Sequence, residues 1–269
     1  MSQSLSPWQN ASVGVAAGII EITILQPMLY WKNASQQKLE FTLNPRVVYR
    51  GLLASCVNMS ILTGIQFPLT GLAQGIITGG EDRKLGKVEQ IAAGFIGGAV
   101  SGFACCPMEL VMIQQQRFGG SILSTPARLV STFGPTIMSR SLLPCMGREG
   151  MFTAGYMGIA PGIAEYLQEE YDMSTVQAKL TGAIGSGIIA ATASHPMDTI
   201  KTCMQGDVEC KTYGGVGGTL RTLMASGGVT RLFSGWAWRT SRMCCAMLIM
   251  SECKSRLSPL MFPDSYKAN

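Results

Sequence analysis

The chain has 269 residues, of which 47% are hydrophobic and only 14% are charged. Ordinary soluble domains are nearer a quarter charged, so this composition argues against one. The few charges are unevenly placed, because residues 51–80, 90–108 and 180–197 contain none and residues 1–31 contain only Glu21. Uncharged stretches of about 18 residues or more are long enough to span a bilayer as helices, so four of them predict a membrane protein.

In chain order the sequence predicts six membrane-spanning helices, at residues 8–37, 48–78, 87–118, 136–166, 174–206 and 231–257. The fourth and sixth carry charges, notably Arg148, Glu149, Arg239 and Arg242, and they count as spans because they complete the repeat described next. Charged side chains within a membrane usually face the interior of the helix bundle or a water-filled cavity.

Three prolines mark an internal repeat, since Pro27, Pro107 and Pro196 lie 80 and 89 residues apart in apolar stretches. A glycine lies nine residues before each proline: Gly18, Gly98 and Gly187. A glutamine lies nine residues after each proline: Gln36, Gln116 and Gln205. Similarity at a fixed period indicates repeated structural units, and small residues let membrane helices pack closely. The sequence predicts three units, residues 1–85, 86–172 and 173–269, each a proline-containing helix, a polar connection and a second helix.

The charges of the connections predict how the units are oriented. Within the units, residues 32–50, 117–140 and 201–239 contain four, three and five basic residues against one, none and two acidic ones, which gives +3 each. Between the units, residues 81–89 sum to zero and residues 165–179 to −3. Cationic connections remain on the side from which a membrane protein inserts, so the three connections within the units lie on one side.

The segments around the prolines follow the pattern P-x-[DE]-x-x-[KR], with a glutamine four residues beyond the base, in full or in part. The third unit matches it fully, with Pro196, Asp198, Lys201 and Gln205. The second unit has Met112 in the basic place, and the first has Leu29 in the acidic place. This pattern resembles the mitochondrial carrier family (solute carrier family 25), of which the chain is identified as a divergent member over nearly its whole length. The resemblance implies an all-α, multi-pass protein of the mitochondrial inner membrane, with six transmembrane helices in three repeats related by pseudo-threefold symmetry.

In that family the odd-numbered helices bend at the prolines and converge on the matrix side. There the acid of one unit pairs with the base of the next, and the resemblance assigns the three glutamines to bracing these pairs. The implied pairs form a matrix gate of three contacts: Lys32 with Asp198, Glu109 with Lys201, and Leu29 with Met112. Removing one member of a buried ion pair strands a charge, whereas replacing both can be neutral. The matched loss favours a contact between Leu29 and Met112 over independent drift at two sites.

Most of the charged residues expected at the opposite gate are missing. Of the places where the family carries charged pairs near the ends of the even-numbered helices, only Glu252 keeps a charge, with Arg256 as its candidate partner. The first connection is also short, with fifteen residues from Gln36 to Gly51, and leaves little room for the surface helix that the family usually has.

In the family, substrate contacts lie midway along the even-numbered helices. The matching positions bring two guanidinium groups, an amide and a carboxylate to one level, with a further guanidinium one turn away: Arg148, Arg242, Asn58, Glu149 and Arg239. Guanidinium groups bind carboxylates through two bonds, and a carboxylate can hold an ammonium group, so the pattern is closest to that of amino-acid carriers. The alternative is that Arg148 and Glu149 pair with each other inside the bundle.

Other features carry weaker signals. His195 is interpreted as a packing residue rather than a proton-coupling one, and Glu21 as the partner of a neighbouring helix or a functional acid. The nine cysteines are interpreted as apolar packing residues. No nucleophile–base pair, phosphate loop, metal cluster or aromatic-basic face stands out, so the sequence predicts neither an enzyme, a cofactor, a metal site nor nucleic-acid binding.

Two functions remain open. The first is exchange (antiport) of a small carboxylate-bearing metabolite, most simply an amino acid, with membrane lipids such as cardiolipin as further partners. The second is a pseudo-carrier that no longer transports and serves as a structural subunit of a respiratory or ATP synthase complex. The weak opposite gate and the short first connection favour the second, and the substrate-site pattern favours the first.

Overall fold

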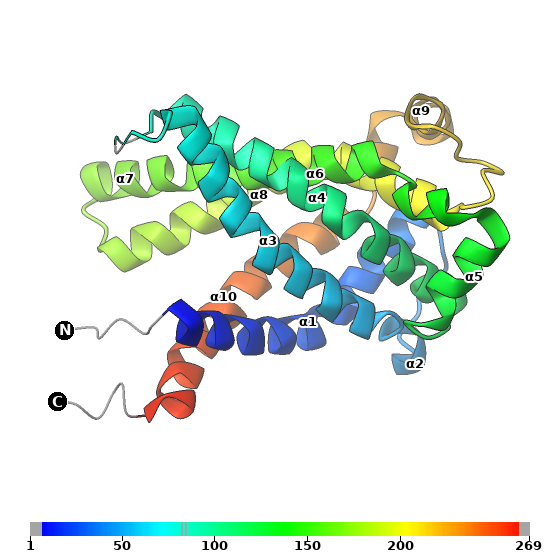
Figure 1. Ribbon diagram of the computed structural model, residues 1–269, viewed down its shortest axis with the longest axis horizontal. Helices are drawn as coiled ribbons and strands as arrows, with labels where there is room; N and C mark the ends of the chain where they lie inside the picture. Colours follow the sequence, from blue (N-terminus) through cyan, green and yellow to red (C-terminus); the bar gives the residue numbers. More distant parts are fainter. Residues whose placement is uncertain (1–6, 82, 84, 264–269) are drawn as a thin grey trace.

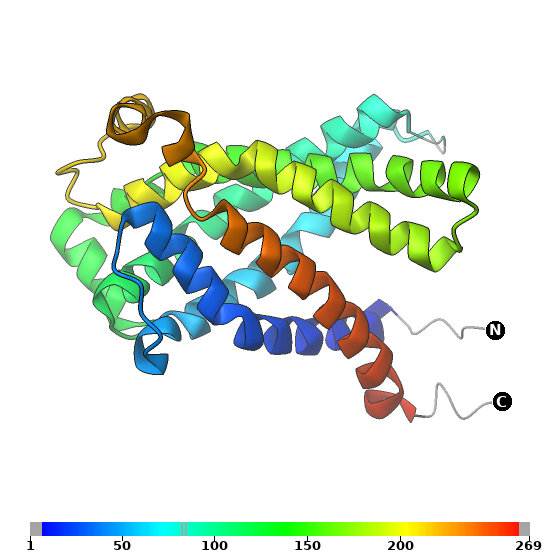
Figure 2. The same ribbon diagram turned by 180° about the vertical axis from the view of Figure 1, so that it is seen from behind.

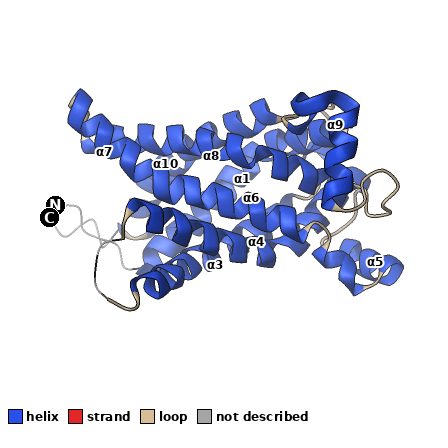
Figure 3. Ribbon diagram, turned by 90° about the horizontal axis from the view of Figure 1, so that it is seen from above, coloured by secondary structure: helices blue, strands red, loops and turns tan. Residues whose placement is uncertain are grey.

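The computed structural model describes residues 7–81, 83 and 85–263. The helices of this part of the chain are α1 (Pro7–Gln37), α2 (Pro45–Val48), α3 (Leu52–Thr78), α4 (Lys87–Phe118), α5 (Ser124–Phe133), α6 (Leu142–Ala154), α7 (Ala160–Tyr171), α8 (Thr175–Gly206), α9 (Val216–Leu232) and α10 (Trp236–Met261). A 3₁₀ helix, η1 (Pro135–Ser139), precedes α6, and a π-helical turn, η2 (Gly155–Ile159), joins α6 to α7. The described residues form helix and loop without a strand (Figure 3), which confirms the predicted all-α class.

The second, fourth and sixth predicted spans begin too early, because α3, α6 and α10 start four to six residues later than expected. Each of these helices is preceded by a residue with a left-handed backbone, with φ of 79° at Gly51, 66° at Ser141 and 79° at Gly235. A right-handed helix cannot continue through such a residue, so the chain turns there before the next helix starts. The predicted ends of the fourth and sixth spans are also too early, since α7 continues to Tyr171 and α10 to Met261.

The six long helical segments pack in a closed sequence. α1 packs against α3 and α10, α3 against α4, α4 against α6, α6 and α7 against α8, and α8 against α10. The start of α1, the end of α10 and the turns after α3 and α7 lie at one end of the molecule, which we call the terminal end (Figures 1 and 2). The helices α2, α5 and α9 lie at the opposite end, the short-helix end (Figure 1). The three cationic connections therefore lie together, as the charge pattern predicted.

The distribution of apolar side chains fits a membrane. Large apolar side chains such as Ile24 on α1 and Phe103 on α4 are exposed, whereas Gln36 and Lys201 are buried. This pattern is the reverse of that in water-soluble proteins. By length and composition, three helical stretches of the described residues could cross a membrane: Ser12–Gln37, Pro45–Thr78 and Lys87–Phe118. The segment formed by α6 and α7 and the helix α10 carry five charged residues each, whereas α8 carries three.

Pro27, Pro107 and Pro196 lie inside α1, α4 and α8. A proline inside a helix removes one hydrogen bond and crowds the preceding turn, which bends the helix. Figure 2 shows α1 changing direction along its length. The connections differ between units as the sequence suggested, because α2 has only four residues where α5 has ten and α9 seventeen.

Candidate functional site

Two buried ion pairs join helices that are far apart in the sequence. The Nζ atom of Lys32 on α1 lies 2.8 Å from Oδ2 of Asp198 on α8, and Nζ of Lys201 on α8 lies 3.2 Å from Oε2 of Glu109 on α4. Asp198 and Lys201 are three residues apart and therefore share one face of α8. The structure thus brings together the two charged pairs that the family resemblance implies.

Asp198 is the centre of a buried ionic network. Besides Lys32, its carboxylate oxygens lie 3.3 Å from Lys201 Nζ, 3.7 Å from Arg148 Nε and 3.8 Å from Arg239 Nη1. These cations come from α1, α6, α8 and α10, so one carboxylate links four helices. Charges attract more strongly away from water, and the buried carboxylate needs these partners because an isolated buried charge is costly.

Arg148 connects the predicted substrate residues to the predicted gate. Its Nη2 atom donates to Glu109 Oε1 at 2.5 Å and also to Glu149 Oε1. The alternative in which Arg148 and Glu149 pair with each other is thus the arrangement observed. The network contains four basic and three acidic side chains, and so a net charge of +1: Lys32, Arg148, Lys201 and Arg239 against Glu109, Glu149 and Asp198.

The other two predicted substrate residues have partners outside this network. Arg242 Nη2 on α10 donates to Glu21 Oε1 on α1 at 2.8 Å, so Glu21 bonds a neighbouring helix. Asn58 on α3 is half-buried; its backbone carbonyl accepts from Cys105 Sγ at 4.0 Å, and its Oδ1 atom has no hydrogen-bond partner. The structure therefore does not gather all five predicted substrate residues into one cluster.

The third predicted gate contact is apolar. Leu29 and Met112 belong to one packed cluster with Ala54, Val111 and Ile113. Leu29 and Met112, which stand where the motif has an acid and a base, therefore share one contact region between α1 and α4. No charge is stranded there, because neither residue carries one.

The three glutamines assigned to bracing take different partners. Gln36 Nε2 donates to Asp198 Oδ2 at 2.9 Å and so supports the ion pair of that carboxylate. Gln205 donates to a cysteine sulfur on α6 at 3.5 Å. Gln116 accepts from Asn33 Nδ2 on α1 at 2.7 Å. Gln36 thus bonds a gate carboxylate, whereas Gln116 bonds an amide that the sequence had not singled out.

The described residues of the terminal end show a different pattern. Glu252 and Arg256 form an ion pair at 2.6 Å, but both are exposed and lie on one helix. Arg83 and Glu89 form another exposed pair at 2.7 Å, which joins the turn after α3 to the start of α4. Neither pair ties two long segments together.

Two arginines that were not among the predicted site residues bond the C-terminal ends of the proline-containing helices α8 and α1. Arg140 Nε donates to the carbonyl of Met204 on α8 at 2.6 Å, and Arg231 Nη2 donates to the carbonyl of Gln36 on α1 at 2.6 Å. Carbonyl groups at a helix end lack partners and carry partial negative charge, so a guanidinium group stabilises them. A sequence signal was present, because Arg140 precedes Ser141 as Arg50 precedes Gly51 in the first unit.

His195 has packing contacts. A ring nitrogen of His195 lies 3.0 Å from the carbonyl oxygen of Ser234, and its ring stacks on Phe233 with centroids 5.8 Å apart. These contacts agree with the packing interpretation of His195. All nine cysteines are free thiols; four of them are buried, whereas Cys210 is exposed and does not fit a packing role.

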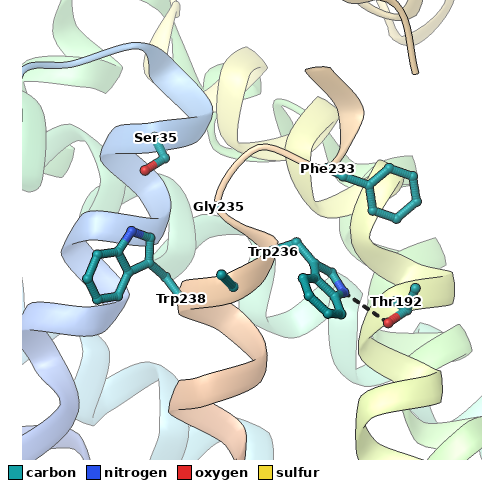
Figure 4. A pocket seen from close by; sticks show the side chains of 7 residues that line it. Ser35, Thr192, Phe233, Gly235, Trp236 and Trp238 are labelled. Carbon is teal, nitrogen blue, oxygen red and sulfur yellow. Dashed lines mark hydrogen bonds between the residues drawn. The ribbon is translucent and has the colours of Figure 1, made fainter. Parts of the chain in front are cut away.

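A surface pocket of about 530 Å³ opens between α1, α8 and α10. Its lining residues are Ser35, Thr192, Phe233, Gly235, Trp236, Ala237 and Trp238. Figure 4 shows Trp236 on α10 donating from Nε1 to Thr192 Oγ1 on α8, at 2.9 Å. The predicted substrate residues do not line this pocket, so it is separate from the candidate site.

The closed packing of six long helical segments, apolar outside and charged inside, defines a helical membrane protein with a charged interior. The sequence profile of the family described as "Mitochondrial carrier protein" matches residues 172–262, which contain the complete motif. The chain is 22% identical to the mitochondrial tricarboxylate transporter 1 of Mycosarcoma maydis, over 90% of this chain and 91% of that protein. It is 25% identical to the mitochondrial glycine transporter YMC1 of Saccharomyces cerevisiae, over 83% of this chain and 81% of that protein.

The chain is therefore similar to mitochondrial carriers over most of its length, and residues 172–262 match the family itself. Its relatives are named as carriers of various small molecules, which supports a transport role in a mitochondrial membrane for this protein. The relatives do not agree on one substrate, so the family alone does not specify what this chain carries.

Proposed function

We propose that this protein exchanges a small carboxylate-bearing metabolite across the mitochondrial inner membrane by alternating access. One observation carries the proposal: Arg148 Nε, Arg239 Nη1 and Arg242 Nε are buried donors that make no hydrogen bond, the first two lying 3.7 and 3.8 Å from the Asp198 carboxylate. Buried donors without hydrogen bonds are costly, and a carboxylate is the acceptor that fits a guanidinium group best. A bound carboxylate would supply the hydrogen bonds that these donors lack.

The net charge of the network supports an anionic substrate. The four basic and three acidic side chains sum to +1, which one carboxylate neutralises. A carboxylate on Arg148 also competes with Glu109, which Arg148 shares with Lys201. Substrate binding would weaken the contacts that hold the short-helix end closed, and a ligand shifts a conformational equilibrium only through such differential contacts. The short-helix end thereby serves as the matrix gate. Each of the units 1–85, 86–172 and 173–269 contributes one proline-containing helix to it, namely α1, α4 and α8.

Amino acids are the first substrates to test. Arg148 and Glu149 are adjacent and paired, and substrate entry would free a guanidinium group for the carboxylate and a carboxylate for the ammonium group. One relative is named a glycine transporter, and others are named for tricarboxylate and for 2-oxoglutarate and malate. Glycine, 2-oxoglutarate and citrate therefore form a minimal panel for a thermal-shift screen, because a bound ligand stabilises the folded protein by mass action.

Uptake into proteoliposomes tests the site. Arg242→Ala and Arg148→Lys are expected to reduce uptake of any stabilising ligand at least tenfold, since the lysine keeps the charge but loses the two-bond geometry. Arg221→Ala, on the exposed face of α9, is the matched control and retains uptake. Normal uptake by both site variants contradicts the assignment.

A second candidate function is a structural subunit of a respiratory or ATP synthase complex. The observation that favours it is the terminal end, where the ion pairs of the described residues are exposed and local. Native gel electrophoresis in mild detergent separates the two functions. A species of the chain's own 28.7 kDa mass plus detergent supports the carrier, whereas stable co-migration with a larger complex supports the subunit.

Membrane lipids, cardiolipin among them, are the proposed partners of the outer surface. Exposed apolar side chains such as Ile24, Phe95 and Phe103 lie along the long helices and suit contact with acyl chains. Delipidation followed by cardiolipin addition is expected to raise the thermal stability of the purified protein. A melting temperature unaffected by cardiolipin counts against this partner.

A further inference from the structure

The contact between α1 and α4 contains a pair of buried amides. Asn33 Nδ2 on α1 donates to Gln116 Oε1 on α4 at 2.7 Å, and the two residues are 1% and 2% exposed. Their remaining side-chain atoms, Asn33 Oδ1 and Gln116 Nε2, have no hydrogen-bond partner. The two side chains therefore depend on each other for their one hydrogen bond inside the bundle.

The register places this amide pair beside the apolar gate contact. Asn33 follows Leu29 by four residues, and Gln116 follows Met112 by four residues. Residues four apart lie on the same face of a helix, about one turn from each other. The amide pair therefore lies one turn beyond the Leu29–Met112 contact on both helices.

The other two units explain why the amides meet here. The residue four beyond the acid position is Ile113 in the second unit and Thr202 in the third, whereas the first unit has Asn33. Gln36 uses its amide on the carboxylate of Asp198. Gln116 follows a methionine in the basic place, so it has no ion pair of its own to support. It bonds the one amide that the first unit supplies at the facing position.

We propose that Asn33 and Gln116 form the third lock of the gate, a neutral amide lock where the other two interfaces have ion pairs. This proposal rests on the proposed function, because a lock matters only in a gate that opens. In the closed state the two amides share one hydrogen bond, and when the gate opens water can bond all of their polar atoms. Separating neutral amides costs less than separating buried charges, so the α1–α4 contact is the first of the three to part.

Thiol labelling of purified protein in detergent tests the lock without a substrate. Cys203 is 1% exposed, and its thiol donates to the Gln36 carbonyl of α1 at 3.0 Å, so opening of the short-helix end exposes it. Cys210 lies on the same tryptic peptide and is exposed, so it reports access of the reagent. Asn33→Ala leaves Gln116 unpaired in the closed state alone. The expected result is a rise in maleimide labelling of Cys203 on the order of fivefold, with Cys210 unchanged.

Two rescue variants and one control keep the test specific. Asn33→Gln with Gln116→Asn exchanges the amides, and Asn33→Asp with Gln116→Lys replaces them by an ion pair; at least one of the two is expected to return labelling to or below the natural level. Gln66→Leu removes a comparable bond between α3 and Thr153 on α6, and is expected to lower thermal stability without raising Cys203 labelling.

The proposal is overturned if Asn33→Ala labels Cys203 at the natural rate. It is also overturned if Gln66→Leu raises labelling as much as Asn33→Ala, because the exposure would then reflect general loosening. Failure of the transport proposal has a separate signature, since uptake can be absent while labelling still responds to Asn33 and Gln116. If the protein transports but substitution of Asn33 and Gln116 does not change Cys203 labelling, the lock proposal is wrong and the transport proposal stands.

Discussion

The two ends of the bundle are held by different interactions. At the short-helix end, seven charged side chains from α1, α4, α6, α8 and α10 form one buried network centred on Asp198. At the terminal end, the ion pairs of the described residues, Glu252 with Arg256 and Arg83 with Glu89, are exposed. Exposed pairs contribute little, whereas breaking a buried pair from one side is costly.

This difference bears directly on alternation. A carrier has to close one end while it opens the other, so its two closed states need comparable free energies. A buried network at one end alone favours the state closed at that end. In the proposed mechanism, the apolar contact of Leu29 and Met112 would lower the cost of opening the short-helix end and bring the two states closer. The amide pair of Asn33 and Gln116 acts in the same direction, because it locks without charge.

The largest effect is expected from Asp198→Asn, which removes the centre of the network. Four cations lie within 3.8 Å of this carboxylate, so the variant leaves them without their shared partner. The expected loss is about 3–5 kcal/mol of unfolding free energy, measured by denaturant unfolding in detergent. Adding Lys32→Met is expected to recover part of it, because one stranded cation is removed. A loss below about 1 kcal/mol means that the network does not hold the short-helix end together.

The apolar contact of the gate is tested by reintroducing its charges. Leu29→Glu places an unpaired carboxylate in the contact region of α1 and α4 and is expected to cost about 3 kcal/mol. Combined with Met112→Arg, the charge gains a partner and part of this loss is recovered, as thermal unfolding of both variants can show. If the double variant is no more stable than Leu29→Glu alone, the two side chains do not meet.

A smaller, pH-dependent effect is expected at Asp207, which follows α8 outside the membrane. Partial burial raises the pKa of Asp207, but bonds from the backbone N–H groups of Tyr213, Thr212 and Lys211 outweigh it and lower the pKa below its ordinary value of 3.8. Its contribution is therefore fully present above that value and is lost as the pH falls through the lowered pKa.

Asp207→Asn is expected to cost about 1 kcal/mol at neutral pH, through weakened bonds to the following loop. The gap between the variant and the natural protein is expected to close as the pH falls below 3.8 and through the lowered pKa, because the natural carboxylate is then protonated as well. Thermal unfolding of both proteins across this pH range measures the gap. A gap that stays constant with pH excludes the carboxylate as its source.

The smallest effect is expected at the terminal end. Glu252→Gln removes one member of an exposed pair within α10, so it is expected to change stability by less than about 0.5 kcal/mol. A loss of stability comparable to that of Asp198→Asn would mean that the two ends are held equally strongly. It would indicate that Glu252 is buried in an ion pair in another conformational state.

Much of the fold could be predicted because it depends on local rules. The spacing of Pro27, Pro107 and Pro196 gave the repeat, and uncharged length gave the spans. The starts of α3, α6 and α10 could not be placed, since hydropathy does not reveal the left-handed turns at Gly51 and Ser141. The pairing of Lys32 with Asp198 followed from the family pattern, and the geometry places the two side chains in contact.

The sequence by itself determined the all-α class and the three-unit repeat, because these depend on composition and spacing, whereas the partners of two charged pairs came from the family resemblance. Only the tertiary structure decided how the remaining polar groups are shared. It joined Arg148 to Glu109, gave Glu21 to Arg242 and set Asn33 against Gln116. The physical reason is that a buried polar group takes the nearest available partner, and nearness between helices far apart in sequence is fixed by packing rather than by spacing along the chain.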